Sequence, residues 1–84
     1  MEHCLITFRS VTPAQRGDIL LRRAGFKCSL RRTPRWMEER GCGYCLRLRP
    51  RDAPRGVQLL RTAGVAFNKV LSTSEQGSVE ELTL

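Results

Sequence analysis

The sequence reads PAQRGDILLRRAG at residues 13–25 and DAPRGVQLLRTAG at residues 52–64. Eight of the thirteen aligned positions are identical, at a constant offset of 39 residues. A solenoid needs about three or more repeats to bury a continuous core. Two copies in one short chain therefore indicate a duplicated half-domain with pseudo-twofold symmetry.

Each copy is predicted to be a helix, because small and apolar residues recur at helical spacing. Gly25 and Gly64 are expected to end the helices, since glycine tolerates the left-handed conformation found there. Thr12 with Gln15 resembles a capping box for the first helix, and Asp52 is the expected cap of the second. The predicted inward faces consist of Ala14, Gly17, Leu21 and Ala24 in the first copy, and Ala53, Gly56, Val57, Leu60 and Ala63 in the second.

Strands are predicted on both sides of each helix, because apolar and polar residues alternate there as they do on a strand with one buried face. The predicted strands are His3–Phe8, Phe26–Arg32, Tyr44–Arg49 and Val65–Leu71. The resulting order is β-α-β-β-α-β. With right-handed crossovers, this order predicts an α+β, ferredoxin-like fold in which two helices cover one face of a four-stranded antiparallel sheet. Cys4 and Cys28 alternate in phase with apolar neighbours and are expected to be buried.

The length of 84 residues is typical of one domain. We assign residues 1–73 to the ferredoxin-like domain and residues 74–84 to a flexible C-terminal tail. That tail is acidic, since it holds Glu75, Glu80 and Glu81 and no basic residue.

Thirteen Arg and two Lys give the chain a formal charge of +7. Without the acidic tail the charge is +10, from fifteen basic and five acidic residues. Such a surface favours anionic partners, which are nucleic acid, acidic proteins or phosphate-bearing small molecules. No apolar stretch approaches the length of a membrane span, and the N-terminus lacks a signal-peptide pattern, so cytoplasmic residence is expected. Cysteines stay reduced in that compartment, which argues against a disulfide framework.

The motif Gly41-Cys42-Gly43-Tyr44-Cys45 is the strongest candidate for chemistry. Glycine on both sides leaves the sulfur of Cys42 little covered and allows another molecule to approach closely. Positive charge stabilises thiolate over thiol. The basic residues near the motif in sequence are Arg40, Arg47 and Arg49. Cys42 is thus the candidate nucleophile and Cys45 a candidate resolving thiol, unless both cysteines only contribute to packing.

Other chemistry fits the motif less well. A thioredoxin-type pair usually begins at a helix N-terminus, whereas this pair opens a strand. Structural zinc needs four ligands, and the chain has one such pair and a single His, so we expect no metal or cofactor. The remaining alternative is a small basic binding module for single-stranded RNA or an acidic protein. Sheets of this topology bind RNA by stacking bases on exposed aromatics, and the third predicted strand presents Cys45, Arg47 and Arg49 instead.

The sequence resembles a short bacterial family labelled selenium/sulfur carrier protein-like. The resemblance covers about residues 4–71, and its most specific element is Cys42-Gly43 followed by Leu46-Arg47-Leu48. It extends to Leu5-Ile6-Thr7-Phe8 and to the Leu-Leu and Ala-Gly steps of both repeats. The resemblance implies a carrier or accessory protein rather than a stand-alone enzyme. It also implies that Cys42 holds a persulfide or selenosulfide, and that a protein partner donates or accepts the atom.

Overall fold

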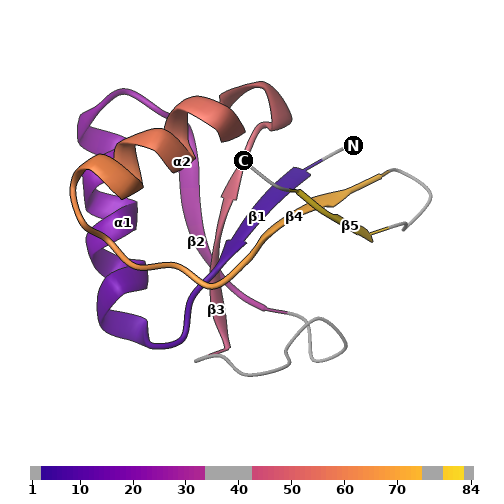
Figure 1. Cartoon of the computed structure of the whole chain (residues 1–84), viewed down its shortest axis with the longest axis horizontal. Helices are drawn as coiled ribbons and strands as arrows, with labels where there is room; N and C mark the ends of the chain where they lie inside the picture. The colour runs from indigo at the N-terminus through magenta and orange to yellow at the C-terminus, as the bar shows by residue number, and fades with distance from the viewer. Residues whose placement is uncertain (1–2, 34–42, 75–78, 83–84) are drawn as a thin grey trace.

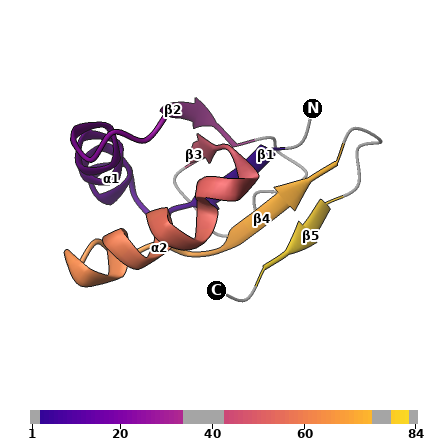
Figure 2. The same ribbon diagram turned by 90° about the horizontal axis from the view of Figure 1, so that it is seen from above.

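The computed structural model describes residues 3–33, 43–74 and 79–82. The described part forms one antiparallel sheet with two helices on the same side of it (Figures 1 and 2). The elements are β1 (His3–Thr7), α1 (Val11–Arg23), β2 (Cys28–Arg32), β3 (Tyr44–Leu48), a 3₁₀ turn (Pro50–Asp52), α2 (Ala53–Thr62), β4 (Val70–Thr73) and β5 (Val79–Glu81). Neither helix is long and apolar enough to cross a membrane, in the part of the chain that the structure describes.

The strand order is β2-β3-β1-β4-β5, and every neighbouring pair is antiparallel. The first four strands have the order and helix placement of the ferredoxin-like fold, which confirms the predicted class. The expected number of four strands was wrong, because Val79–Glu81 of the acidic tail pairs with β4 as a fifth strand. This addition has an apolar basis, since Val79 and Leu82 both pack against the rest of the domain.

The fourth strand also starts later than the pattern predicted, at Val70 rather than Val65. The residues just before β4 form backbone hydrogen bonds with β1 at Thr7. The Asn68 amide donates to the Thr7 carbonyl at 2.7 Å, and the Thr7 amide donates to the Lys69 carbonyl at 2.8 Å. Val65 is buried where α2 ends, so the alternation that begins there reflects packing of the turn rather than a strand.

Both helices end in the same way, as the repeat predicts. The Gly25 and Gly64 residues have φ values of +91° and +73°. The amides of Phe26 and Val65 donate to the carbonyls of Leu21 and Leu60, at 3.0 and 2.9 Å. These bonds, with those from the two glycine amides, form a Schellman motif in each copy.

The N-termini differ from expectation. Helix α1 begins at Val11 after Ser10, so the predicted Thr12 capping box is wrong. Asp52 is the N-cap of α2 but makes no side-chain capping bond. Its carboxylate instead accepts a 2.9 Å hydrogen bond from Arg49 Nε.

The core lies between the helices and the sheet and contains the predicted inward faces, except that Ala24 and Ala63 are exposed at the helix ends. Gly17 and Gly56 lie where the helices approach the sheet and each other. A Cβ on Gly17 would lie 3.0 Å from Leu46 Cδ1 and 3.2 Å from Leu60 Cδ2. A Cβ on Gly56 would lie 3.2 Å from Leu48 Cδ1 and 3.7 Å from Leu21 Cδ2. Each glycine thus accommodates the leucine of the other copy, which is the packing consequence of the duplication.

Candidate functional site

Cys42 precedes the point where the chain enters β3. Cys42, Gly41 and Arg40 lie outside the described residues, so their predicted roles remain predictions. The next residue, Gly43, is buried and has a φ of +81°. Its carbonyl accepts a 2.7 Å hydrogen bond from the Thr33 amide, which closes the β2–β3 pair at this end of the sheet. A side chain at position 43 would be strained by that φ, so glycine is required next to Cys42 for a conformational reason as well as for access.

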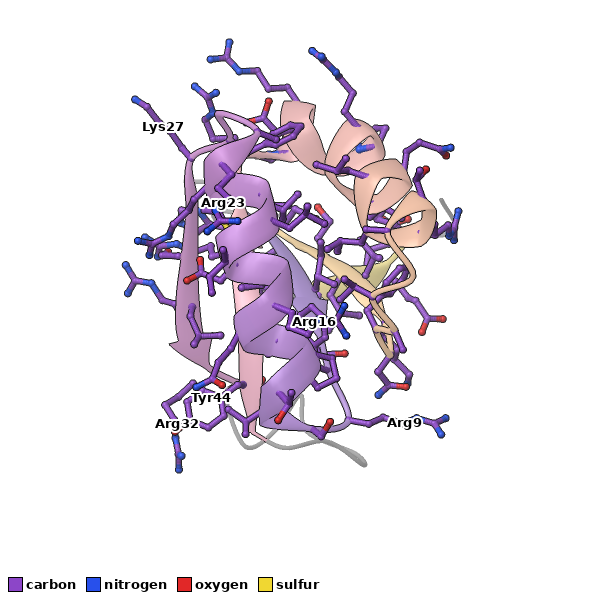
Figure 3. All side chains as sticks on the ribbon, turned by 90° about the vertical axis from the view of Figure 1, so that its left-hand side faces the viewer. Arg9, Arg16, Arg23, Lys27, Arg32 and Tyr44 are labelled. Carbon is purple, nitrogen blue, oxygen red and sulfur yellow. The ribbon has the colours of Figure 1, made fainter. Side chains whose placement is uncertain are left out.

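Two arginines of β2 lie at this end of the sheet. Arg31 pairs across the strands with Cys45, and Arg32 pairs with Tyr44. The Arg32 guanidinium lies 5.2 Å from the centre of the Tyr44 ring, and its Nη1 donates to the Tyr44 hydroxyl at 3.4 Å. Figure 3 shows the side chains of Arg32 and Tyr44 at the end of the molecule opposite Lys27. Arg32 is exposed and places positive charge where the chain enters β3. Arg31 is also exposed, but its Nε donates to Ser29 Oγ at 3.3 Å, farther from this end of the sheet.

Arg47 and Arg49, which the sequence analysis grouped with Cys42, lie farther along the chain. At about 3.3 Å per residue, Arg47 is roughly 13 Å and Arg49 roughly 20 Å from Gly43 along the strand direction. Arg47 is opposite Leu5 on β1 and Ser29 on β2. Arg49 lies beyond β3 and pairs with Asp52. The structure therefore brings the Arg32 guanidinium to the entry of β3, and it places Arg47 and Arg49 toward the other end of the sheet.

Arg31 and Arg32 were not predicted as site residues, because both are distant from Cys42 in sequence. A signal was nevertheless present. Antiparallel pairing of the two predicted strands, with their near ends joined by residues 33–43, places Arg32 opposite Tyr44. Cross-strand pairing is set by register, and register follows from which faces are buried.

Cys45 lies on the sheet face directed away from the helices, which we call the second face. The side chain is buried, at 1% exposure, and packs with Leu5 and Leu71 in a small apolar cluster that Val79 also contacts. The predicted alternation of β3 is thus confirmed for Cys45 and Arg47. The second face is not fully solvated, however, because three strands bury apolar side chains on it.

The other two described cysteines are shielded thiols. Cys4 is fully buried, and burial raises its pKa to about 11. Cys28 is partly buried, with its sulfur 3.5 Å from Asp18 Oδ1. Burial and then the charge of Asp18 raise the pKa of Cys28 to about 12. Neither thiol ionises near neutral pH, so neither is suited to nucleophilic chemistry.

His3 lies on the second face at the opposite end of the sheet from Gly43. Burial, followed by the positive charges of Arg47 and Arg31, lowers the pKa of His3 from its ordinary value. A lowered pKa means that the folded state favours the neutral imidazole. The contribution of neutral His3 to stability is therefore present above its ordinary pKa, and it is lost as the pH falls through the pKa of His3 in the folded protein.

Replacing Arg47 with Gln should raise the pKa of His3, because one of the positive charges that disfavour the imidazolium is removed. His3 is the single histidine of the chain, so its ring resonances can be followed in an NMR pH titration without ambiguity. Arg23→Gln removes the same charge from the exposed side of α1 and should leave the His3 pKa nearly unchanged. An unchanged His3 pKa in Arg47→Gln would contradict this assignment.

Within residues 3–33, 43–74 and 79–82, no three His, Cys, Asp or Glu side chains lie close enough together to hold a metal ion. The second face, over the same residues, presents no Phe, Tyr or Trp from the strands. A stacking platform for bases is therefore missing from the described part of that face.

Fold and site together define a small, arginine-rich ferredoxin-like domain with a Cys-Gly step at the entry to its third strand. The chain belongs to the family described as "Putative Se/S carrier protein-like", whose model matches residues 3–72. No curated protein matches the chain. No solved structure matches it either.

Proposed function

We propose that this protein is a cytoplasmic carrier that accepts sulfane sulfur or selenium on Cys42 and passes it to a protein partner. The family name points to this class of activity. The observation that carries the assignment to one residue is the state of the other cysteines. Cys4 and Cys45 are buried, and the pKa values of Cys4 and Cys28 are raised to about 11 and 12. Cys42 is the one cysteine for which nothing described argues against reactivity.

The loading step is a thiol exchange. The Cys42 thiolate attacks the outer sulfur of a persulfide on the donor protein. A bond forms between the two sulfurs, the donor's S–S bond breaks, and the donor cysteine leaves as a thiolate. Cys42 then holds the persulfide, and no external oxidant or reductant is consumed. Delivery repeats the exchange with an acceptor nucleophile.

Positive charge near Cys42 supports both steps, because it stabilises the attacking thiolate and the anionic persulfide. Among the described residues, Arg32 supplies this charge at the entry of β3. Arg40 is the basic residue nearest to Cys42 in sequence, two positions before it. The exposed side chains of Arg31 and Arg32 also offer a docking surface to an acidic partner.

Cys45 follows Cys42 by three residues and is the proposed resolving thiol. Its thiolate would attack the inner sulfur of a Cys42 persulfide, forming a Cys42–Cys45 disulfide and releasing hydrosulfide. Burial of Cys45 slows this reaction, which would otherwise discharge the carrier. Cys45→Ser should therefore lengthen the lifetime of the adduct.

Incubation with a cysteine desulfurase and cysteine should add one sulfur atom to the protein, detected by intact-mass measurement and removed by a reductant. Cys42→Ser should abolish this addition. Cys28→Ser is the matched control, because it also removes one thiol, here from a partly buried position, and it should load as the wild type does. Undiminished loading of Cys42→Ser would show that the carrier assignment is wrong.

A further inference from the structure

A groove lies at the end of the sheet opposite Gly43, and the proposed carrier function does not use it. Its volume is about 630 Å³, within the range of small-molecule sites. Residues from the start of β1, the turn between α1 and β2, and the end of β3 line it. The basic lining residues are His3, Arg22, Lys27, Arg47 and Arg49.

Two of these cations are already compensated. Arg22 Nε lies 2.9 Å from Asp18 Oδ1, and Arg49 Nε lies 2.9 Å from Asp52 Oδ2. Lys27 and Arg47 form no ion pair with any carboxylate among the described residues. Within the described residues, the groove therefore keeps two positive charges that no carboxylate pairs with, and they match the charge of about −2 that a phosphate monoester carries near neutral pH.

The two cations differ in mobility. Arg47 is half-buried and held in the middle of the sheet, between Leu5 and Ser29 on its neighbours. Lys27 is exposed at the corner where the chain enters β2, on the same side of the molecule as the end of α1 (Figure 3). Arg47 is thus a preformed contact for an anion, and Lys27 is a flexible one.

The groove also has an apolar wall. Phe26 is partly buried against the core and lines the groove next to Lys27. An aromatic ring beside two cations suits a ligand that joins an anionic group to an apolar or aromatic part.

We propose that this groove binds a small phosphate monoester, with its phosphate on Arg47 and Lys27 and its organic part against Phe26. The site lies at the far end of the sheet from Gly43, the described residue that follows Cys42. Phosphate binding is therefore independent of whether Cys42 carries sulfur, and a failure of one proposal does not affect the other.

The test is an NMR titration of the full chain with phenyl phosphate, phenol and inorganic phosphate. Phenyl phosphate should bind saturably, with the largest amide shifts in His3, Cys28, Ser29 and Arg47. Inorganic phosphate should bind more weakly, and phenol should not bind measurably. Equal affinity for phenyl and inorganic phosphate would overturn the role of Phe26.

Arg47→Gln should weaken phenyl phosphate binding by about tenfold or more, because a charge-assisted contact is lost. Arg23→Gln changes the net charge equally but lies outside the groove lining, so its affinity should stay near that of the wild type. Cys42→Ser should also bind as the wild type does. The amide spectrum of each variant reports whether it remains folded. Equal weakening by Arg23→Gln, shifts spread over the whole basic surface, or no saturable binding would each overturn the proposal.

Discussion

Replacing Leu60 with Ala is expected to lower the free energy of unfolding by about 2–5 kcal/mol, the usual range for a buried leucine. Leu60 is 0% exposed and lies in the contact between the two helices, opposite Gly17. A domain of this length has a total stability of about 4–13 kcal/mol, at roughly 0.05–0.15 kcal/mol per residue. The substitution therefore removes a large part of the stability and leaves part of the population unfolded at 37 °C if the domain is at the low end.

Chemical denaturation followed by circular dichroism measures this change. Leu21→Ala removes the equivalent leucine of the first repeat and should cost a similar amount, because Leu21 is also fully buried and faces Gly56. Ile19→Ala is the matched control, since Ile19 lies on α1 like Leu21 but is 52% exposed. It should change the free energy of unfolding by no more than about 0.5 kcal/mol. Similar losses for Ile19→Ala and Leu60→Ala would contradict the assigned core.

The second large effect concerns thiol reactivity. In the folded protein, Cys28 should react with iodoacetamide at pH 8 about a thousandfold more slowly than in the denatured chain. The reason is that a pKa raised from 9.0 to about 12 lowers the thiolate fraction by that factor. Cys4, with a pKa of about 11 and no exposure, should be slowed at least a hundredfold. Peptide mapping after timed alkylation separates these cysteines from Cys42, which we expect to react first.

The raised pKa of Cys4 also predicts how the stability of the protein depends on pH. Because the pKa of Cys4 is raised in the folded state, the folded protein holds the thiol proton more tightly than the unfolded chain does. The stabilisation that the Cys4 thiol contributes is complete below pH 9.0 and is lost as the pH rises through about 11. At pH 11 the loss in the free energy of unfolding is about 2 kcal/mol. Cys4→Ala should show a smaller loss of stability than the wild type between pH 9 and 11. Rapid alkylation of Cys4 or Cys28 in the folded protein, or identical alkaline profiles, would contradict their assignment as shielded thiols.

Sequence by itself determined the features that depend on neighbours a few residues apart. The repeat located both helices, Gly25 and Gly64 marked their ends, and alternation separated the two faces of β3. Burial of Cys4 followed from the same alternation. Helical and strand periodicity, and the need for glycine at positive φ, are local properties that a single sequence expresses directly.

Tertiary structure alone decided which distant residues meet. It added β5, which is too short and too polar to stand out in the sequence, because Val79 and Leu82 find apolar partners on residues far away in the chain. It buried Cys45 on the second face through Leu5 and Leu71. It also separated the arginines, with the Arg32 guanidinium at the entry of β3 and Arg47 in the groove lining. Cross-strand register sets these proximities, and register is fixed by packing of the whole sheet rather than by any local pattern.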